Sequence, residues 1–170
     1  MINIEKIDIE RLRRPTPSYH IMEPTEANLD AFAEKLEKGY LYVSDEIRDP
    51  ECLRGMVRNL YARGPFNLIY EIGEFQGVIG FLNIVIGHKA DMMLKMWDLA
   101  FWSKDAVRQG RQLIEYIIET FELKRVGTTT ADPRIVKMAH LVGFTEEGVS
   151  RNAFSWKGKV MDEISLSIVR

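Results

Sequence analysis

The sequence is poor in the residues that build metal centres and disulfide frameworks. Cys52 is the only cysteine, which excludes an internal disulfide and a zinc site made of several cysteines. The histidines His20, His88 and His140 are scattered, without the spacing of metal ligands and without a cysteine or serine partner. We therefore expect no metal cofactor.

Long apolar runs and an excess of one charge are also missing. No segment has the length needed to cross a bilayer, and no N-terminal run resembles a signal peptide. The 23 lysines and arginines nearly balance 25 aspartates and glutamates, so there is no overall attraction for nucleic acid or a membrane surface. These absences predict a soluble, cytoplasmic protein without a membrane partner, and they argue against nucleic acid as a partner.

What is present is the composition of one globular domain. The 170 residues are 46% hydrophobic and 28% charged, which is enough to bury a core without metal or disulfide support. Residues 1–17 are polar and contain two prolines, so we expect an irregular or partly ordered N-terminal arm. Residues 18–170 are expected to form a single domain.

The spacing of apolar residues predicts the order of helices and strands. Stripes at i, i+3, i+4 and i+7 predict helices at 29–36, 53–60, 114–121 and 135–142, the second beginning at Pro50 after Asp49. Strands are expected at 18–22, 67–72, 78–86, 94–102, 125–130, 149–156 and 160–168. The long helix between strands 94–102 and 125–130 predicts one parallel crossover. The predicted fold is α+β, an α/β/α arrangement of about seven mostly antiparallel strands in one mixed sheet flanked by about four helices.

Basic side chains gather where the third of these helices is expected to start. Lys104, Arg108 and Arg111 would be disfavoured by the helix dipole there, which suggests an anionic partner. A strand that enters a helix through a turn containing Gly110 would also present free main-chain N–H groups. The alternative is that Gly110 serves packing alone and the cations form a solvated face, paired with acidic neighbours.

Two segments resemble those of the GNAT superfamily of N-acetyltransferases. The run Asp98-Leu99-Ala100-Phe101-Trp102 resembles the Glu-Ile-Gly-Tyr-Trp strand of the branch that acetylates ribosomal-protein N-termini. Residues 107–112 resemble the cofactor signature Gln/Arg-x-x-Gly-x-Gly/Ala, with Gly110 kept and with Val107 and Gln112 departing from it. The predicted order of elements over residues 18–170 is also that of the GNAT fold.

The resemblance continues through Asp132 to Phe144, where Gly143-Phe144 keeps the ending typical of the family. Ile135 stands where the family often has serine, and Ala139 stands where many members have a tyrosine general acid. Asp132 followed by a proline is also an ordinary helix N-cap, which explains both residues without a ligand.

The resemblance implies transfer of an acetyl group from acetyl-CoA, or of another acyl group, to a primary amine of a small molecule, peptide N-terminus or lysine. The amine would attack the thioester directly in a ternary complex, with Asp98 as the base that keeps the nitrogen neutral. The residues implied around the cofactor are Leu99, Ala100, Phe101, Arg108, Gln109, Gly110, Arg111, Gln112 and Asp132. The acceptor pocket would be lined by Trp97, Phe154 and Trp156, although strand aromatics more commonly serve packing.

Two other interpretations remain open. The departures at Val107, Gln112, Ile135 and Ala139 favour a non-catalytic GNAT-fold protein that binds or assembles with a partner. The basic run Arg11–Arg14 suggests a modifier associated with RNA or ribosomes, as a local argument only. A monomer or a homodimer is expected in each case.

Overall fold

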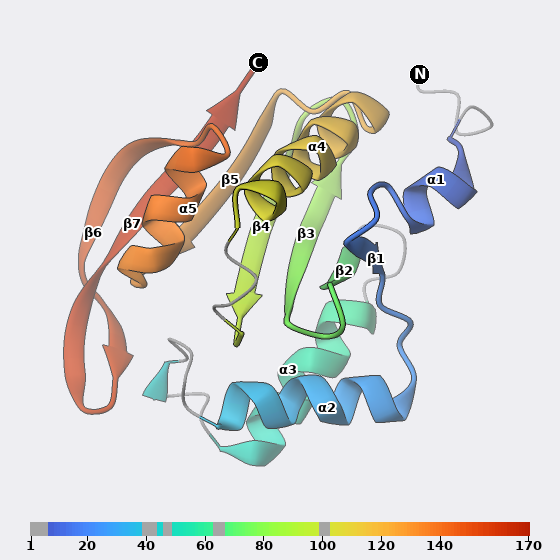
Figure 1. The fold of residues 1–170 in the computed structure, drawn as a ribbon. Coiled ribbons are helices and arrows are strands. Elements are labelled where there is room, and N and C mark those ends of the chain that lie inside the picture. The colour runs from blue at the N-terminus through green and yellow to red at the C-terminus, as the bar shows by residue number, and fades with distance from the viewer. Residues whose placement is uncertain (1–6, 39–43, 46–48, 63–66, 99–102) are drawn as a thin grey trace.

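A computed structural model describes residues 7–38, 44–45, 49–62, 67–98 and 103–170. Within these residues the chain forms a seven-stranded sheet flanked by helices (Figure 1). The strands are β1 (Tyr19–Ile21), β2 (Leu68–Ile72), β3 (Gly77–Val85), β4 (Lys89–Met96), β5 (Arg125–Thr130), β6 (Thr145–Trp156) and β7 (Lys159–Val169). The helices are α1 (Ile9–Arg13), α2 (Glu26–Glu37), α3 (Pro50–Ala62), α4 (Lys104–Thr120) and α5 (Pro133–Leu141).

The strands follow the order β1-β2-β3-β4-β5-β7-β6 across the sheet. Every neighbouring pair is antiparallel except β4 and β5, which are parallel and are joined through the crossover helix α4. The predicted mixed, mostly antiparallel sheet with one parallel crossover is therefore confirmed. The crossover is of interest because ligands of α/β proteins commonly bind where the connections between neighbouring strands reverse their direction along the sheet.

Two apolar clusters cover the two faces of the sheet. One lies under α4 and α5, and the other lies under α2 and α3. Val78 and Ile79 are consecutive residues of β3, and they belong to different clusters because successive strand side chains point to opposite faces. Figure 1 shows α4 and α5 in front of the strands, with α2 and α3 grouped at the lower end.

The predicted helical stripes are the buried faces of these helices. Leu113 and Ile117 of α4 are fully buried, as are Phe32 of α2 and Leu53 of α3. Each stripe recurs every three or four residues, so one side of each helix faces the sheet continuously. Burial of these stripes is the main contribution that fixes the helices on the sheet.

The strand predicted at 94–102 is wrong in its bounds. β4 instead spans Lys89–Met96, because the turn at Gly87, with φ +74°, returns the chain at once into antiparallel pairing with β3. The ladder ends after Met96, where the main-chain N–H groups of Trp97 and Asp98 both donate to the carbonyl of Gln76. Residues 99–102, and with them the predicted ligands Leu99, Ala100 and Phe101, lie outside the described residues.

The N-terminal arm, expected to be irregular or partly ordered, contains a short docked helix. Asp8 caps α1 by accepting a hydrogen bond from the main-chain N–H of Arg11. The buried hydroxyl of Tyr70 donates to the carbonyl of Leu12 at 3.0 Å, and the Arg11 guanidinium lies 4.7 Å from the centre of the Tyr116 ring. These contacts tie α1 to β2 and to α4.

The last hairpin is longer than predicted, since β6 begins at Thr145 rather than at residue 149. Residues 145–153 are all exposed, so no alternation of apolar residues marked the start of this edge strand. Among the helices in the described part of the chain, none is long and apolar enough to span a membrane.

Candidate functional site

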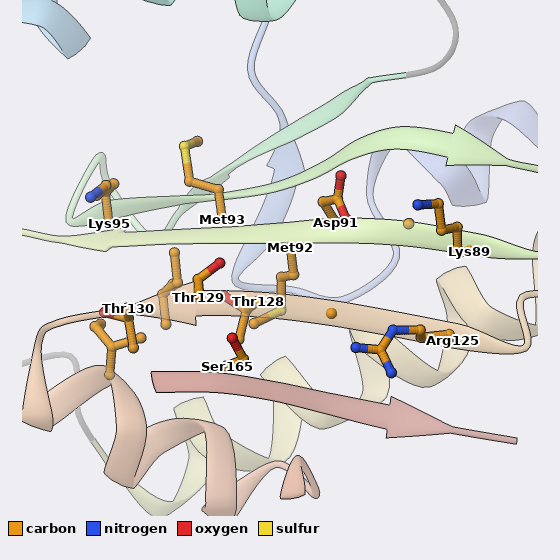
Figure 2. A pocket seen from close by; sticks show the side chains of 14 residues that line it. Lys89, Asp91, Met92, Met93, Lys95, Arg125, Thr128, Thr129, Thr130 and Ser165 are labelled. Atoms are coloured by element: carbon orange, nitrogen blue, oxygen red, sulfur yellow. The ribbon is translucent and has the colours of Figure 1, made fainter. Parts of the chain in front are cut away.

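A cleft opens where β4 and β5 separate. The two strands pair at three positions only, from Lys89 with Arg125 to Asp91 with Gly127. Beyond these positions β5 continues to pair with β7 as far as Thr130, but it no longer pairs with β4. The resulting cleft has a volume of about 380 Å³ and is lined by side chains of both strands (Figure 2).

The separation leaves main-chain groups available along β4. Strand N–H and C=O groups alternate between the two neighbouring strands, and β3 satisfies only one side of residues 92–96. Pairing with β5 is given for Lys89–Asp91 and for no later residue of β4 within the described part of the chain. Main-chain groups at a strand edge are suited to hold an extended ligand that carries amides of its own.

The element that follows β4 in the chain is helix α4, and its N-terminus lies within the described residues. Ser103 is the N-cap, and its hydroxyl accepts the main-chain N–H of Ala106 at 3.1 Å. The main-chain N–H of Val107 already donates to the carbonyl of Ser103 at 3.1 Å, so regular helix bonding begins there. The N–H groups of Lys104 and Asp105 precede the first intrahelical bonds, and within the described part of the chain neither has a hydrogen-bond acceptor, so they are the candidate donors of this helix start.

The expected position of Gly110 in a turn at the helix start is wrong. Gly110 lies well inside α4 and faces the sheet, where a Cβ atom would meet the Tyr19 hydroxyl at 3.0 Å. Gln109 is also buried, and its side chain accepts from the main-chain N–H of Ser18 at 2.9 Å and donates to Asp105 at 2.6 Å. Gly110 therefore packs against β1, which is the alternative that the sequence left open for it, and Gln109 is bonded to the residue that precedes β1.

The cations of α4 are partly neutralised by the helix itself. Arg108 forms an ion pair with Asp105, and hydrogen bonds from Gln109 and then Arg108 lower the pKa of that carboxyl. Lys104 and Arg111 are exposed and form no ion pair within the described residues. The exposed residue Gln112 also lies on α4, beyond its first turn. Lys104 thus places one exposed cation beside the N–H groups at the start of α4. The segment 108–112, which the sequence suggested as the cofactor site, lies further along the helix.

Asp98 stands two residues after the end of β4, and it is not one of the described residues that line the cleft. It is half-buried, and its Oδ2 accepts a hydrogen bond from the Gln76 side chain at 3.3 Å. Its main-chain N–H donates to the Gln76 carbonyl at 3.1 Å, which fixes the backbone where the strand ends. The carboxylate is therefore positioned, and its role as a base stays a prediction.

The three predicted pocket aromatics lie in two different places. Trp97 packs in the cluster under α2 and α3, with its ring centre 4.8 Å from that of Phe75, and its indole N–H donates to the Phe75 carbonyl. This placement favours packing over a pocket role for Trp97. Phe154 and Trp156 are half-buried near the end of the β6–β7 hairpin, where Lys157 lies 4.7 Å over the Trp156 ring.

Asp132 has the capping role that the sequence offered as the alternative to a cofactor ligand. It is the N-cap of α5 and accepts the main-chain N–H of Arg134 at 2.9 Å. Asp132 is only 4% exposed, and its carboxylate forms an ion pair with the Arg134 guanidinium at 2.6 Å. The carboxylate is thus already held by protein groups.

Two features of the site were missed by sequence reasoning. Lys95 lines the cleft and is half-buried; burial lowers the pKa of its ammonium, while the charges of Asp132 and Glu163 act in the opposite direction. Asp45 accepts hydrogen bonds from the main-chain N–H groups of Lys157 and Gly158, both at 2.8 Å. Asp45 thereby connects the segment between α2 and α3 to the tip of the β6–β7 hairpin, a pairing of distant residues that no local pattern reveals.

No protein-family model and no curated protein sequence matches the chain. Solved structures match it over most of their length, and they are GNAT acetyltransferases, so the chain has the GNAT fold. One is the acetyltransferase that modifies the N-terminal serine of 50S ribosomal subunit protein L7/L12 from Salmonella typhimurium, with TM-score 0.70 and 18% identity over 93% of this chain and 98% of that one.

Two further structures give the same result. A GNAT-family acetyltransferase from Bacillus anthracis matches with TM-score 0.65 and 16% identity over 89% of this chain and 95% of that one. The microcin C7 self-immunity acetyltransferase in complex with acetyl-CoA and AMP matches with TM-score 0.68 and 16% identity over 91% and 94%. At these identities the likeness establishes the fold.

Proposed function

We propose that the protein is an N-acyltransferase that uses acetyl-CoA, or another acyl-CoA, to modify a primary amine. The observation that carries this proposal is the separation of β4 from β5, which opens a cleft beside the only parallel pair of the described sheet. Similar folds support it, because solved structures of this fold were determined with CoA or with acetyl-CoA and AMP bound.

In the proposed complex the donor lies along β4. Its pantetheine amides pair with main-chain groups of residues 92–94 that face β5. Its diphosphate lies near the free N–H groups of Lys104 and Asp105, where the helix dipole favours negative charge. The exposed cations Lys104 and Arg108 then lie near the phosphates, and this arrangement replaces the turn at Gly110 that the sequence suggested.

The proposed chemistry needs few side chains. The neutral amine attacks the thioester carbonyl carbon, and a main-chain N–H of the open strand edge stabilises the developing oxyanion. Asp98 accepts the proton that the amine loses, directly or through water, and CoA leaves as the thiolate. Ala139 is buried and has no proton to donate, so the thiolate takes its proton from another group or from water. Phe154 and Trp156 are our candidates for the acceptor wall.

Donor binding is tested by the melting temperature of the full chain with acetyl-CoA. At about 100 times Kd, a ligand that binds only the folded state adds about 2.7 kcal/mol to the free energy of unfolding. For a chain of this size that corresponds to a rise of roughly 5–10 °C in Tm. No rise at millimolar acetyl-CoA or other acyl-CoAs would overturn the proposal.

The location of the donor is tested with paired variants. Gly127 lies in the cleft with ordinary contacts around its position, so Gly127→Leu should fill the cleft and abolish the rise in Tm. Gly148→Leu is the matched control, because Gly148 is exposed on β6 with nothing within 4 Å. Lys104→Glu should weaken binding more than Lys159→Glu, which makes the same charge change at the exposed hairpin.

A non-catalytic binding protein is the second candidate. It is favoured by one observation, the continuous helix through 107–112, which leaves no glycine turn for the diphosphate. The two functions differ in turnover: the enzyme releases free CoA thiol when acetyl-CoA is mixed with a panel of amines. In the enzyme, Asp98→Asn should lower this rate while leaving the rise in Tm with acetyl-CoA nearly unchanged. Donor binding without thiol release for any amine would support the binding protein.

A further inference from the structure

Lys95 occupies an unusual position for a lysine. It is the penultimate residue of β4, on the part of the strand that has left β5, and its side chain lines the cleft. Figure 2 shows Lys95 and Thr130 at the same end of the cleft, on neighbouring strands. Strand alternation places Lys95 on the same side of β4 as Asp91 and Met93, whereas Met92 points to the opposite side.

Charged groups from several elements surround this ammonium. Asp132 at the start of α5 and Glu163 on β7 are the carboxylates whose charges act on it. Asp132 is committed to its ion pair with Arg134. On the strands that line the cleft, Asp91 accepts a hydrogen bond from Asn83 at 2.9 Å, and Arg125 is paired with Glu147.

The net result of these effects is a lowered pKa for the Lys95 ammonium. Burial disfavours the charged form and is the largest effect on the pKa of Lys95, which is lowered in spite of the two carboxylates. A larger fraction of this side chain is therefore a free amine at a given pH than for an ordinary lysine. A free amine is the nucleophile that a thioester acylates.

We propose that Lys95 is a self-acylation site, taking the acyl group from an acyl-CoA held in the cleft between β4 and β5; this inference rests on the proposed function. The Lys95 Nζ attacks the thioester carbonyl carbon, so that a C–N bond forms and the C–S bond breaks. One amine proton passes to the departing sulfur, which gives CoA thiol and an amide on the lysine. No oxidant, reductant or further reactant takes part.

The geometry favours this reaction in two ways. The long lysine stem and the donor share one cleft, so the reaction is effectively intramolecular. The product is uncharged, so acylation also removes the unfavourable burial of an ammonium. Because an amide does not return its acyl group to an amine, the modified lysine is an end state, and its added bulk should obstruct donor binding.

The experiment incubates the full chain with acetyl-CoA, without an amine acceptor, and measures acetylation of each lysine by peptide mass spectrometry. Lys89 is the matched reference, because it lines the other end of the same cleft on the same strand and is exposed. We expect Lys95 to be acetylated faster than Lys89, because Lys95 lies on the part of β4 that no longer pairs with β5, whereas Lys89 pairs with Arg125. Acetyl phosphate, which lacks the CoA moiety, should give a much smaller preference. Gly127→Leu should remove the preference seen with acetyl-CoA.

The outcomes separate this inference from the proposed function. If acetyl-CoA raises Tm but Lys95 is acetylated no faster than Lys89, the self-acylation site is refuted and the transferase proposal stands. If acetyl-CoA neither raises Tm nor acetylates Lys95, both fall. An equal preference for Lys95 with acetyl phosphate would show intrinsic reactivity without a donor in the cleft, and would also refute the site. In Lys95→Arg the rise in Tm should survive prolonged incubation with acetyl-CoA, whereas in the unmodified sequence it should decline as acetylation proceeds.

Discussion

The contact between Gly110 and Tyr19 allows a direct test of how α4 sits on the sheet. A Cβ at Gly110 would approach the Tyr19 hydroxyl to 3.0 Å, while the next atom of that side chain, Cζ, would lie at 3.9 Å. The hydroxyl alone therefore opposes a larger residue. Gly110→Ala should be unfavourable in the natural sequence and favourable when Tyr19→Phe has removed the hydroxyl.

The magnitudes follow from two opposing effects. Replacing an interior helix glycine with alanine stabilises a helix by about 1 kcal/mol. Overpacking a buried contact typically costs about 1–3 kcal/mol, and Tyr19 has little freedom to move because it is only 5% exposed. We therefore expect Gly110→Ala to lower the free energy of unfolding by about 1 kcal/mol in the natural sequence. In the Tyr19→Phe background the same change should raise it by about 1 kcal/mol, which gives a coupling of about 2 kcal/mol.

The assay is urea unfolding of the four proteins of this cycle, followed by far-UV circular dichroism. Gly55→Ala is the control, because Gly55 lies in α3 with nothing within 4 Å of the added Cβ. It should stabilise the protein by about 1 kcal/mol in both backgrounds. If Gly110→Ala has the same effect with and without the Tyr19 hydroxyl, Gly110 does not face Tyr19, and the described packing of α4 is refuted.

Two further predictions concern the β6–β7 hairpin. Hydrogen bonds from Arg125 and then Ser167 lower the pKa of Glu147 from 4.5 to about 2, so its stabilising effect is complete above pH 4.5 and is lost as the pH falls toward 2. Across that interval Tm should fall more steeply in the natural sequence than in Glu147→Gln, and parallel curves would contradict this. Asp45→Asn removes the negative charge that accepts the main-chain N–H groups of Lys157 and Gly158, so these amide hydrogens should exchange with solvent roughly tenfold faster. The amide hydrogen of Phe144 is the control: it donates to the carbonyl of Ala139, and its exchange rate should not change.

The sequence predicted the fold where burial is periodic. The stripe that includes Leu113 and Ile117 faces the sheet continuously, so its spacing carries the structural information. The prediction missed the starts of two strands, residues 89–93 and 145–148. At Lys89–Asp91 a single small apolar residue stands between two charged ones, and residues 145–148 are all exposed. Their pairing is set by the Gly87 turn and by β7, which are partners outside the local window.

The position of Gly110 was predicted less well than the fold, for a different reason. The resemblance drew attention to Gly110, but the helix is started by Ser103, whose hydroxyl caps the main-chain N–H of Ala106. That serine is an ordinary N-cap signal and was readable in the sequence. The environment of Lys95 was not readable, since it depends on β5 leaving β4 and on carboxylates from α5 and β7.

The Gly110 cycle also decides where a CoA diphosphate can bind. If Gly110 supplied the close main-chain approach of a phosphate turn, alanine would abolish the rise in Tm with acetyl-CoA in either background. In the structure its side faces Tyr19, and the free donors lie at Lys104 and Asp105, well before it in the helix. Gly110→Ala combined with Tyr19→Phe should therefore keep the full rise in Tm, measured against its own melting temperature without ligand. If the variant keeps its free energy of unfolding but loses the rise in Tm, the diphosphate binds at Gly110. The proposal that it binds at the N-terminus of α4 would then be refuted.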